Sequence, residues 1–156
     1  MARLRSIRLR RFRDVGHAKR ALLMEALAWL LLARLALVFI PFPRLARRLG
    51  TFVAPNDARA IGAAAHREPG QAHIAEQVGW AVIRAARHAP FTAVCLPQAM
   101  AARIMLTRRG VPSVLHFGAS KAPGAPMNAH AWLDAAGVEV TGYPEAKSMA
   151  AIACFV

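Results

Sequence analysis

The stretch AVCLPQAMAARIMLTRRGVPSVLHFGA, residues 93–119, changes its hydrophobic periodicity at Gly110. Before this glycine, Leu96, Met100 and Ile104 recur at every fourth residue, which predicts a helix from about residue 96 to residue 109. After it, residues 111–119 (VPSVLHFGA) are typical of a strand. The stretch therefore predicts a junction between a helical half of the chain and a half made of strands.

The residues before this junction predict further helices. Residues 18–40 form a long apolar segment, which Pro41 and Pro43 end. Residues 43–50 (PRLARRLG) predict a short helix with a glycine stop, and residues 71–88 predict another helix. Residues 51–70 are a mixed connector, in which a helical turn after Asp57 is one interpretation.

The residues after the junction predict a small antiparallel sheet. Strands are expected at residues 129–134 (AHAWLD), 138–143 (VEVTGY) and 151–156 (AIACFV), with a loop over 120–128 and a turn or short helix over 144–150. Helices followed by strands favour the α+β class. We expect a basic arm over residues 1–17 and one domain over 18–156, helical over 18–109 and built of strands over 111–156.

Positive charge is concentrated at the start of the chain. Lys and Arg number 21 against eight Asp and Glu, a formal net charge of +13, and residues 1–50 hold twelve of these bases and two of the acids. Such an arm suggests an anionic partner, or it is simply solubilising. The chain shows no zinc-finger spacing, RNP-type aromatic cluster or recognition-helix pattern, so nucleic acid is not the expected partner.

The segment over residues 18–40 has the length of a membrane span, which needs about 20 residues. Glu25 and Arg34 interrupt it, and each charge in the middle of a span costs about 2.5–3.5 kcal/mol. A buried or partner-facing helix is therefore favoured, with peripheral membrane contact as the alternative. Two cysteines without a CxxC motif fit a reducing compartment, and no signal peptide is read, so we expect a cytoplasmic protein.

Cys95 lies at the predicted start of the helix over residues 96–109. Pro97 occupies the first turn, where the N–H that proline lacks would have no partner. Free N–H groups and the dipole at a helix start favour a thiolate, and they can stabilise the oxyanion formed at an attacked carbonyl. Cys95 is thus a candidate nucleophile. The alternative is a small buried residue, which is also the interpretation of Cys154.

His130 is the candidate base among the six histidines of the chain, because it begins a predicted strand after a loop rich in Pro and Gly. Alternation along this strand puts His130, Trp132 and Asp134 on one face. The alternative is that His130 is structural. Trp132 is expected to pack the sheet against the Cys95 helix or, with Leu96, to line a substrate groove. We expect no metal and no cofactor.

The motifs CLPQAMAARIMLTRRGVPSVLHFGA (95–119) and AHAWLDAAGVEVTG (129–142) together resemble the transglutaminase-like leader peptidases of lasso-peptide biosynthesis. In that family a Cys-Leu pair opens a helix that ends in Arg-Arg-Gly, and a strand, a loop and Ala-His-Ala-Trp follow. Here Gly118-Ala119 replaces the Gly-Val-like end of that strand. The Leu-rich segment and PFPRLARRLG (41–50) also look like the family, so the resemblance runs from about residue 18 and is most specific over residues 94–142.

This resemblance implies a papain/transglutaminase-like fold and a cysteine protease that removes the leader from a ribosomally made precursor. Cys95 would be the nucleophile and His130 the base, acting through a thioester. An ATP-dependent cyclase then closes the ring. Because the chain leaves no room for a fused leader-recognition domain, a separate recognition protein is implied. The helix over residues 21–42 and the basic arm are the surfaces offered to that protein or to the leader.

One departure from the family concerns the residue that orients His130. The family's third catalytic residue is an Asp about twelve positions after the His, and Gly142 stands there. The side chains that could substitute are Asp134, Glu139, Thr141 and Glu145, and the alternative is a backbone carbonyl or a water. Asp134 follows His130 on the same strand, about 7 Å away, which is poor geometry for a hydrogen bond. A catalytically weak or inactive scaffold, or another amide acyl transfer, is the competing interpretation.

Overall fold

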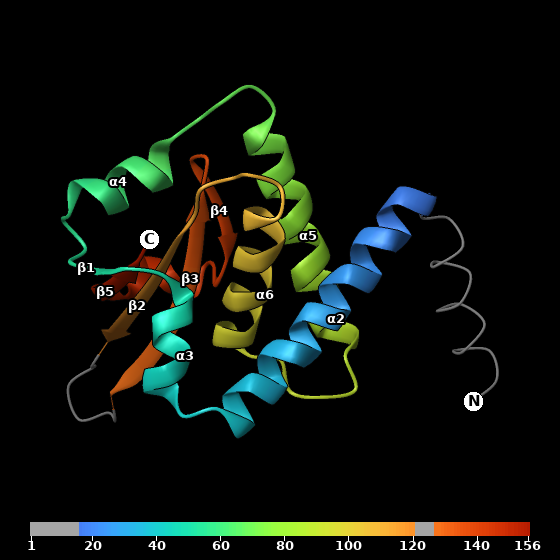
Figure 1. Cartoon of the computed structure of the whole chain (residues 1–156), viewed down its shortest axis with the longest axis horizontal. Helices are drawn as coiled ribbons and strands as arrows, with labels where there is room; N and C mark the ends of the chain where they lie inside the picture. The colour runs from blue at the N-terminus through green and yellow to red at the C-terminus, as the bar shows by residue number, and fades with distance from the viewer. Residues whose placement is uncertain (1–15, 121–126) are drawn as a thin grey trace.

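A computed structural model describes residues 16–120 and 127–156, so the predicted basic arm lies almost wholly outside the described residues. The helices are α2 (His17–Phe39), α3 (Phe42–Leu49), α4 (Ala58–Ala65), α5 (Gln71–His88), α6 (Cys95–Thr107) and the short 3₁₀ helix η1 (Glu145–Ser148). The strands are β1 (Phe52–Val53), β2 (Val114–Ser120), β3 (Asn128–Ala135), β4 (Val138–Thr141) and β5 (Ala150–Phe155) (Figure 1). The predicted α+β class, helices first and a small antiparallel sheet second, is confirmed.

Most element bounds lie within two residues of those predicted, and two regions differ in a way that matters for the fold. Residues 111–113 lie outside β2, which begins at Val114, and Val111 turns back to cap α6 by donating its N–H to the carbonyl of Leu106 at 3.0 Å. The connector over residues 51–70 contains a two-residue strand, β1, as well as a full helix, α4. Asp57 begins α4 because its carboxylate accepts a hydrogen bond from the N–H of Arg59 at 2.8 Å.

The sheet has the strand order β1-β5-β2-β3-β4, and every pair is antiparallel. The β3–β4 hairpin turns at Ala136 and Gly137, which both have positive φ angles, of 52° and 71°. In Figure 1, α2, α5 and α6 lie on one side of this sheet and α4 lies on the other. The sheet is therefore the central layer of the protein.

The two faces of the sheet carry different residues because side chains alternate along each strand. Leu115, Ala131 and Leu133 join the large core formed with α2, α5 and α6. Val114 and Cys154 point the other way and pack with α4 in a smaller cluster. This alternation also determines which face holds His130.

A partly buried guanidinium joins α6 to the strand β5. Arg103 donates hydrogen bonds to the carbonyl oxygens of Ser113, at 3.1 Å, and Phe155, at 2.8 Å. Burial lowers the pKa of Arg103, which nevertheless stays protonated because an arginine begins from so high a value. The contact holds the end of β5 against the middle of α6.

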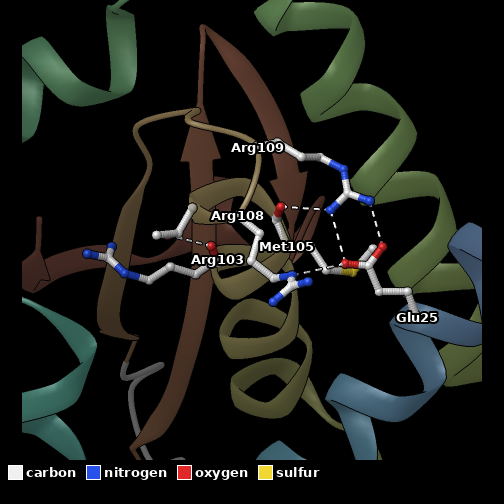
Figure 2. Close-up of polar contacts among 6 residues, drawn as sticks. Glu25, Arg103, Met105, Arg108 and Arg109 are labelled. Atoms are coloured by element: carbon white, nitrogen blue, oxygen red, sulfur yellow. Dashed lines mark hydrogen bonds and ion pairs between the residues drawn. The ribbon is translucent and has the colours of Figure 1, made fainter.

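Glu25, one of the two charges that interrupt the apolar segment, is paired with two arginines that directly follow α6. Its carboxylate accepts two hydrogen bonds from Arg109, at 2.6 and 3.1 Å, and lies 3.8 Å from Arg108 (Figure 2). Arg109 also donates to the carbonyl oxygen of Met105 at 2.9 Å. The pair therefore ties α2 to the carboxyl end of α6, where the helix dipole favours positive charge.

Replacing Glu25 by glutamine is expected to lower the free energy of unfolding by about 1–2 kcal/mol at neutral pH, because a two-fold hydrogen-bonded ion pair is lost. The hydrogen bond from Arg109 is the main cause that lowers the pKa of Glu25 below its usual value of 4.5. The contribution of the Glu25 carboxylate to the free energy of unfolding is thus complete above the pKa that Glu25 has in the unfolded chain. It disappears as the pH falls through the lower pKa that Glu25 has in the folded protein. Urea unfolding at pH 7 and pH 3 measures both effects.

Glu76→Gln is the matched control for this prediction, because Glu76 is exposed and lies 4.0 Å from His73 on the same helix. It should leave the free energy of unfolding nearly unchanged at both pH values. Equal destabilisation by the two substitutions would contradict a specific contribution from the Glu25–Arg109 pair.

Candidate active site

Cys95 is the first residue of α6 and is half-buried. The first intrahelical bond runs from the N–H of Gln98 to the carbonyl of Val94, at 3.3 Å. The N–H groups of Cys95 and Leu96 come before that bond, and Pro97 has none, so no carbonyl of α6 can accept from them. These are the groups that can bind an oxyanion beside the thiol.

Gln98 stabilises the loop that precedes Cys95. Its side-chain amide donates a hydrogen bond to the carbonyl oxygen of Ala93 at 2.7 Å. The contact fixes the backbone immediately before Cys95, and it leaves the thiol itself without a side-chain hydrogen bond among the described residues. Gln98 is therefore a positioning residue for the start of α6.

His130 lies near the start of β3, and the backbone of Gly142 holds its ring. The Nε2 atom of His130 is 2.7 Å from the carbonyl oxygen of Gly142. A carbonyl oxygen only accepts, so Nε2 is the protonated nitrogen and Nδ1 keeps the lone pair that a general base needs. The orienting group is thus a backbone carbonyl oxygen, one of the alternatives that the sequence left open, at the position where the resembled family has an aspartate.

The side chains considered as orienters of His130 have other surroundings. Asp134 accepts a hydrogen bond from the hydroxyl of Tyr143 at 2.6 Å. Glu139 forms an ion pair of 3.1 Å with Lys147. Thr141 is buried, and its hydroxyl has no hydrogen-bond partner. Glu145, the fourth candidate, is exposed at the start of η1. No hydrogen bond or ion pair joins any of the four side chains to His130 in the described part of the chain.

Gly142 has room for a carbonyl at this place but none for a side chain. Its φ angle is +87°, and a Cβ atom would lie 2.5 Å from Cβ of Trp132 and 2.7 Å from the carbonyl oxygen of Ala131. No side chain can be added here without moving β3. A backbone oxygen is therefore the only orienter that this position supplies to His130.

No hydrogen bond or ion pair links the thiol of Cys95 to the imidazole of His130 among the described residues. Figure 1 shows α6 and β3 beginning at the same end of the molecule. His130 shares the face of Trp132, on which it stacks at 6.3 Å, whereas Ala131 and Leu133 point into the core with α6. A reaction that uses both Cys95 and His130 needs a hydrogen bond between them, and such catalytic hydrogen bonds often tighten only when substrate is bound.

Trp132 occupies a different place from the one expected. It is buried, and its ring stacks on His116 at 5.2 Å on the face turned away from α6. The prediction that it packs the sheet against the Cys95 helix is therefore wrong, because alternation gives that place to its neighbours. Its stacking on His130 makes it a wall beside the imidazole, and Leu96 packs partly buried against the core next to Cys95.

Another cysteine and histidine, Cys154 and His116, lie in a row with Asp134 on the face of the sheet that carries Trp132. Cys154 Sγ is 3.1 Å from Nδ1 of His116, and Nε2 of His116 is 3.0 Å from Oδ2 of Asp134, although that second contact lacks hydrogen-bond geometry. Burial raises the pKa of the Cys154 thiol, and the charge of Asp134 raises it further. Because Cys154 is also wholly buried, it is a poor nucleophile, in agreement with its interpretation as a core residue.

Sequence reasoning missed this row, although strand register contained a signal for it. His116 pairs across the sheet with both Trp132 and Cys154, and Val114 pairs with Asp134. Cross-strand partners share a face, so the register alone brings the three side chains together. The register itself depends on strand pairing, which periodicity within one strand does not reveal.

Residues 36–153 match the sequence model of the transglutaminase-like superfamily, and this span includes Cys95, His130 and Gly142. The chain belongs to the transglutaminase-like superfamily, which includes cysteine peptidases and acyltransferases. No curated protein and no solved structure matches the chain. Membership favours acyl transfer through a cysteine as the chemistry of this site.

Proposed function

We propose that the protein is a cysteine endopeptidase that removes the leader peptide from a lasso-peptide precursor. The observation that carries the proposal is the combination of Cys95 at the first turn of α6 with a His130 whose Nε2 is held by a backbone carbonyl. Superfamily membership and the Ala-His-Ala-Trp motif over residues 129–132 support it. Cys95 would act as nucleophile, with His130 as the base and later the acid.

The reaction has two halves. Nδ1 of His130 takes the proton of the Cys95 thiol, and sulfur attacks the carbonyl carbon at the end of the leader. The oxyanion that forms is bound by the N–H groups of Cys95 and Leu96, and the C–N bond breaks as His130 protonates the departing amine. Water then hydrolyses the thioester, which frees the leader and restores the thiol.

The proposal includes partners and a location. A separate leader-recognition protein would present the precursor, and an ATP-dependent cyclase would take the core peptide whose new amino group closes the ring. We place these reactions in the cytoplasm, because neither cysteine of the described chain is in a disulfide and a free thiol needs reducing conditions. No cofactor enters the scheme.

The test is a mass spectrum of a synthetic lasso precursor after incubation with the full chain and the recognition protein. We expect two new masses, which are those of the leader and of the core peptide and which sum to the precursor plus one water. Protein pretreated with iodoacetamide should give neither mass. Omitting the recognition protein should slow cleavage without changing the cut.

The same experiment distinguishes two other functions. The lack of a carboxylate on His130 favours an inactive scaffold of the same maturation complex, which would bind the precursor and leave its mass unchanged. An acyltransferase would produce a mass shift without chain cleavage. Either result would contradict the peptidase proposal.

A further inference from the structure

The outward face of α2 is apolar, although the helix already buries another apolar face. Leu23, Ala26, Leu30 and Ala33 are buried against the other helices. On the opposite side, Met24, Leu31, Leu35 and Val38 follow each other at helical spacing and expose 63, 43, 41 and 60% of their surface. Leu32 and Phe39 widen this stripe, with exposed fractions of 51 and 76%. We call these six residues the outer stripe.

The six residues of the outer stripe carry no charge. Of the two charges in the middle of α2, Glu25 is turned towards Arg109, just after α6, and Arg34 is half-buried. Arginines come before and after α2 in the sequence instead. Arg44, Arg47 and Arg48 are exposed on α3, which follows directly, and six arginines occur in residues 1–15, which precede α2 in the sequence. An apolar surface flanked by arginines is the composition of helices that lie in the interface of an anionic membrane.

A groove continues from the stripe towards α6. It has a volume of about 390 Å³ and lies between α2, α3 and α6, with Leu32, Ile40 and Met100 in its wall. Arg48 and Arg108 also line it. An acyl chain beside an anionic headgroup matches this combination of apolar wall and guanidinium groups.

α2 is long and apolar enough to cross a bilayer by length and composition alone. Spanning would require it to leave the core, however, and to break the pair between Glu25 and Arg109. A second copy of the chain fits the stripe poorly, since each chain carries a net charge of +13 and would bring its arginines close to those of the other. A lipid surface of negative charge complements both the stripe and its flanks.

We propose that the protein binds peripherally to anionic membranes, with the outer stripe of α2 lying in the plane of the interface and the arginines of α3 on lipid headgroups. Bound in this way, α2 keeps its inner face packed on α5 and α6. The stripe and the α3 arginines are separate from Cys95 and His130, so membrane binding does not depend on the peptidase proposal.

The experiment is cosedimentation of the full chain with vesicles of phosphatidylcholine alone and with phosphatidylglycerol added. We expect binding to the anionic vesicles, at least tenfold weaker binding to the neutral ones, and a loss of binding as salt is raised. The double variant Leu35→Gln/Val38→Gln should bind at least tenfold more weakly. Arg44→Gln/Arg47→Gln should reduce the binding by a similar factor and weaken its salt dependence.

The matched control is Ile61→Gln/Ile152→Gln, which removes two apolar side chains of 59 and 65% exposure from α4 and β5. It should bind like the unaltered protein, and circular dichroism checks that all variants fold. Equal binding of the Leu35/Val38 variant and its control would overturn the proposal. Two other results would also overturn it, if vesicle binding stayed the same. In one, the Leu35/Val38 variant turns a dimer into a monomer. In the other, this variant loses only its binding to the recognition protein.

Discussion

Cys95→Ala is expected to lower the rate of precursor cleavage by at least about 10⁴-fold, because it removes the sulfur atom that forms the thioester in the proposed reaction. Folding should be almost unaffected. The thiol is half-buried, makes no hydrogen bond among the described residues, and is replaced by a residue with a high helix propensity. Mass-spectrometric rates and a urea unfolding curve measure the two quantities on the same protein sample.

Cys154→Ala is the matched control, because Cys154 is the other thiol and lies 3.1 Å from Nδ1 of His116, whose Nε2 is in turn 3.0 Å from Asp134. We expect it to keep cleavage activity at a temperature where it is folded, since its thiol is buried and its pKa is raised. Iodoacetamide should likewise label Cys95 and leave Cys154 unmodified in the folded protein. If cleavage activity survived in Cys95→Ala and disappeared in Cys154→Ala, the nucleophile would be Cys154 and the assignment of Cys95 would be wrong.

Gly142→Ala is expected to lower the free energy of unfolding by about 2–4 kcal/mol, which is the range of strongly destabilising substitutions. The new Cβ would meet Cβ of Trp132 at 2.5 Å and the carbonyl oxygen of Ala131 at 2.7 Å, at a φ of +87° that disfavours any side chain. Relief requires β3 and β4 to separate. That movement would also withdraw the carbonyl from Nε2 of His130, so cleavage should fall even at temperatures where the variant stays folded.

Gly70→Ala separates the two causes of the lost stability in Gly142→Ala, which are the contacts of the new Cβ and the backbone strain at positive φ. Gly70 has nearly the same φ, +84°, but a Cβ there would meet no atom within 4 Å. We expect a loss of only about 1 kcal/mol, from backbone strain alone, and unchanged cleavage. Equal losses of stability in the two variants would show that the contacts with Trp132 and Ala131 do not matter. Thermal or urea unfolding of both variants decides this.

The helices were predictable from the sequence because each signal lies within the helix. α5 has the bounds that its apolar spacing and Pro90 predict, and α6 begins one residue before the predicted start, at Cys95. β1 was not predictable, since two residues carry no periodicity and their strand character depends on pairing with β5. The fold class can thus be predicted from local sequence patterns, whereas β1 can be recognised only once the whole sheet is assembled.

The site was predictable in part for the same reason. The sequence indicates a cysteine at a helix start and a histidine at a strand start. The partner of His130 is a carbonyl oxygen, which every residue possesses, so no side-chain motif can reveal it. The partner of Glu25 was equally hidden, because Arg109 is 84 positions away and comes near only when α2 packs on α6.

The position of β5 has a consequence for how the protein is made. β5 is synthesised last of the five strands, yet it lies between β1 and β2, and Phe52 pairs with Phe155. Until β5 leaves the ribosome, β1 has no neighbour, β2 has a free edge, and Arg103 lacks the carbonyl of Phe155. Contacts so distant in sequence form slowly. The helices can thus pack together during translation, whereas the sheet is complete only once residues 150–155 have been made.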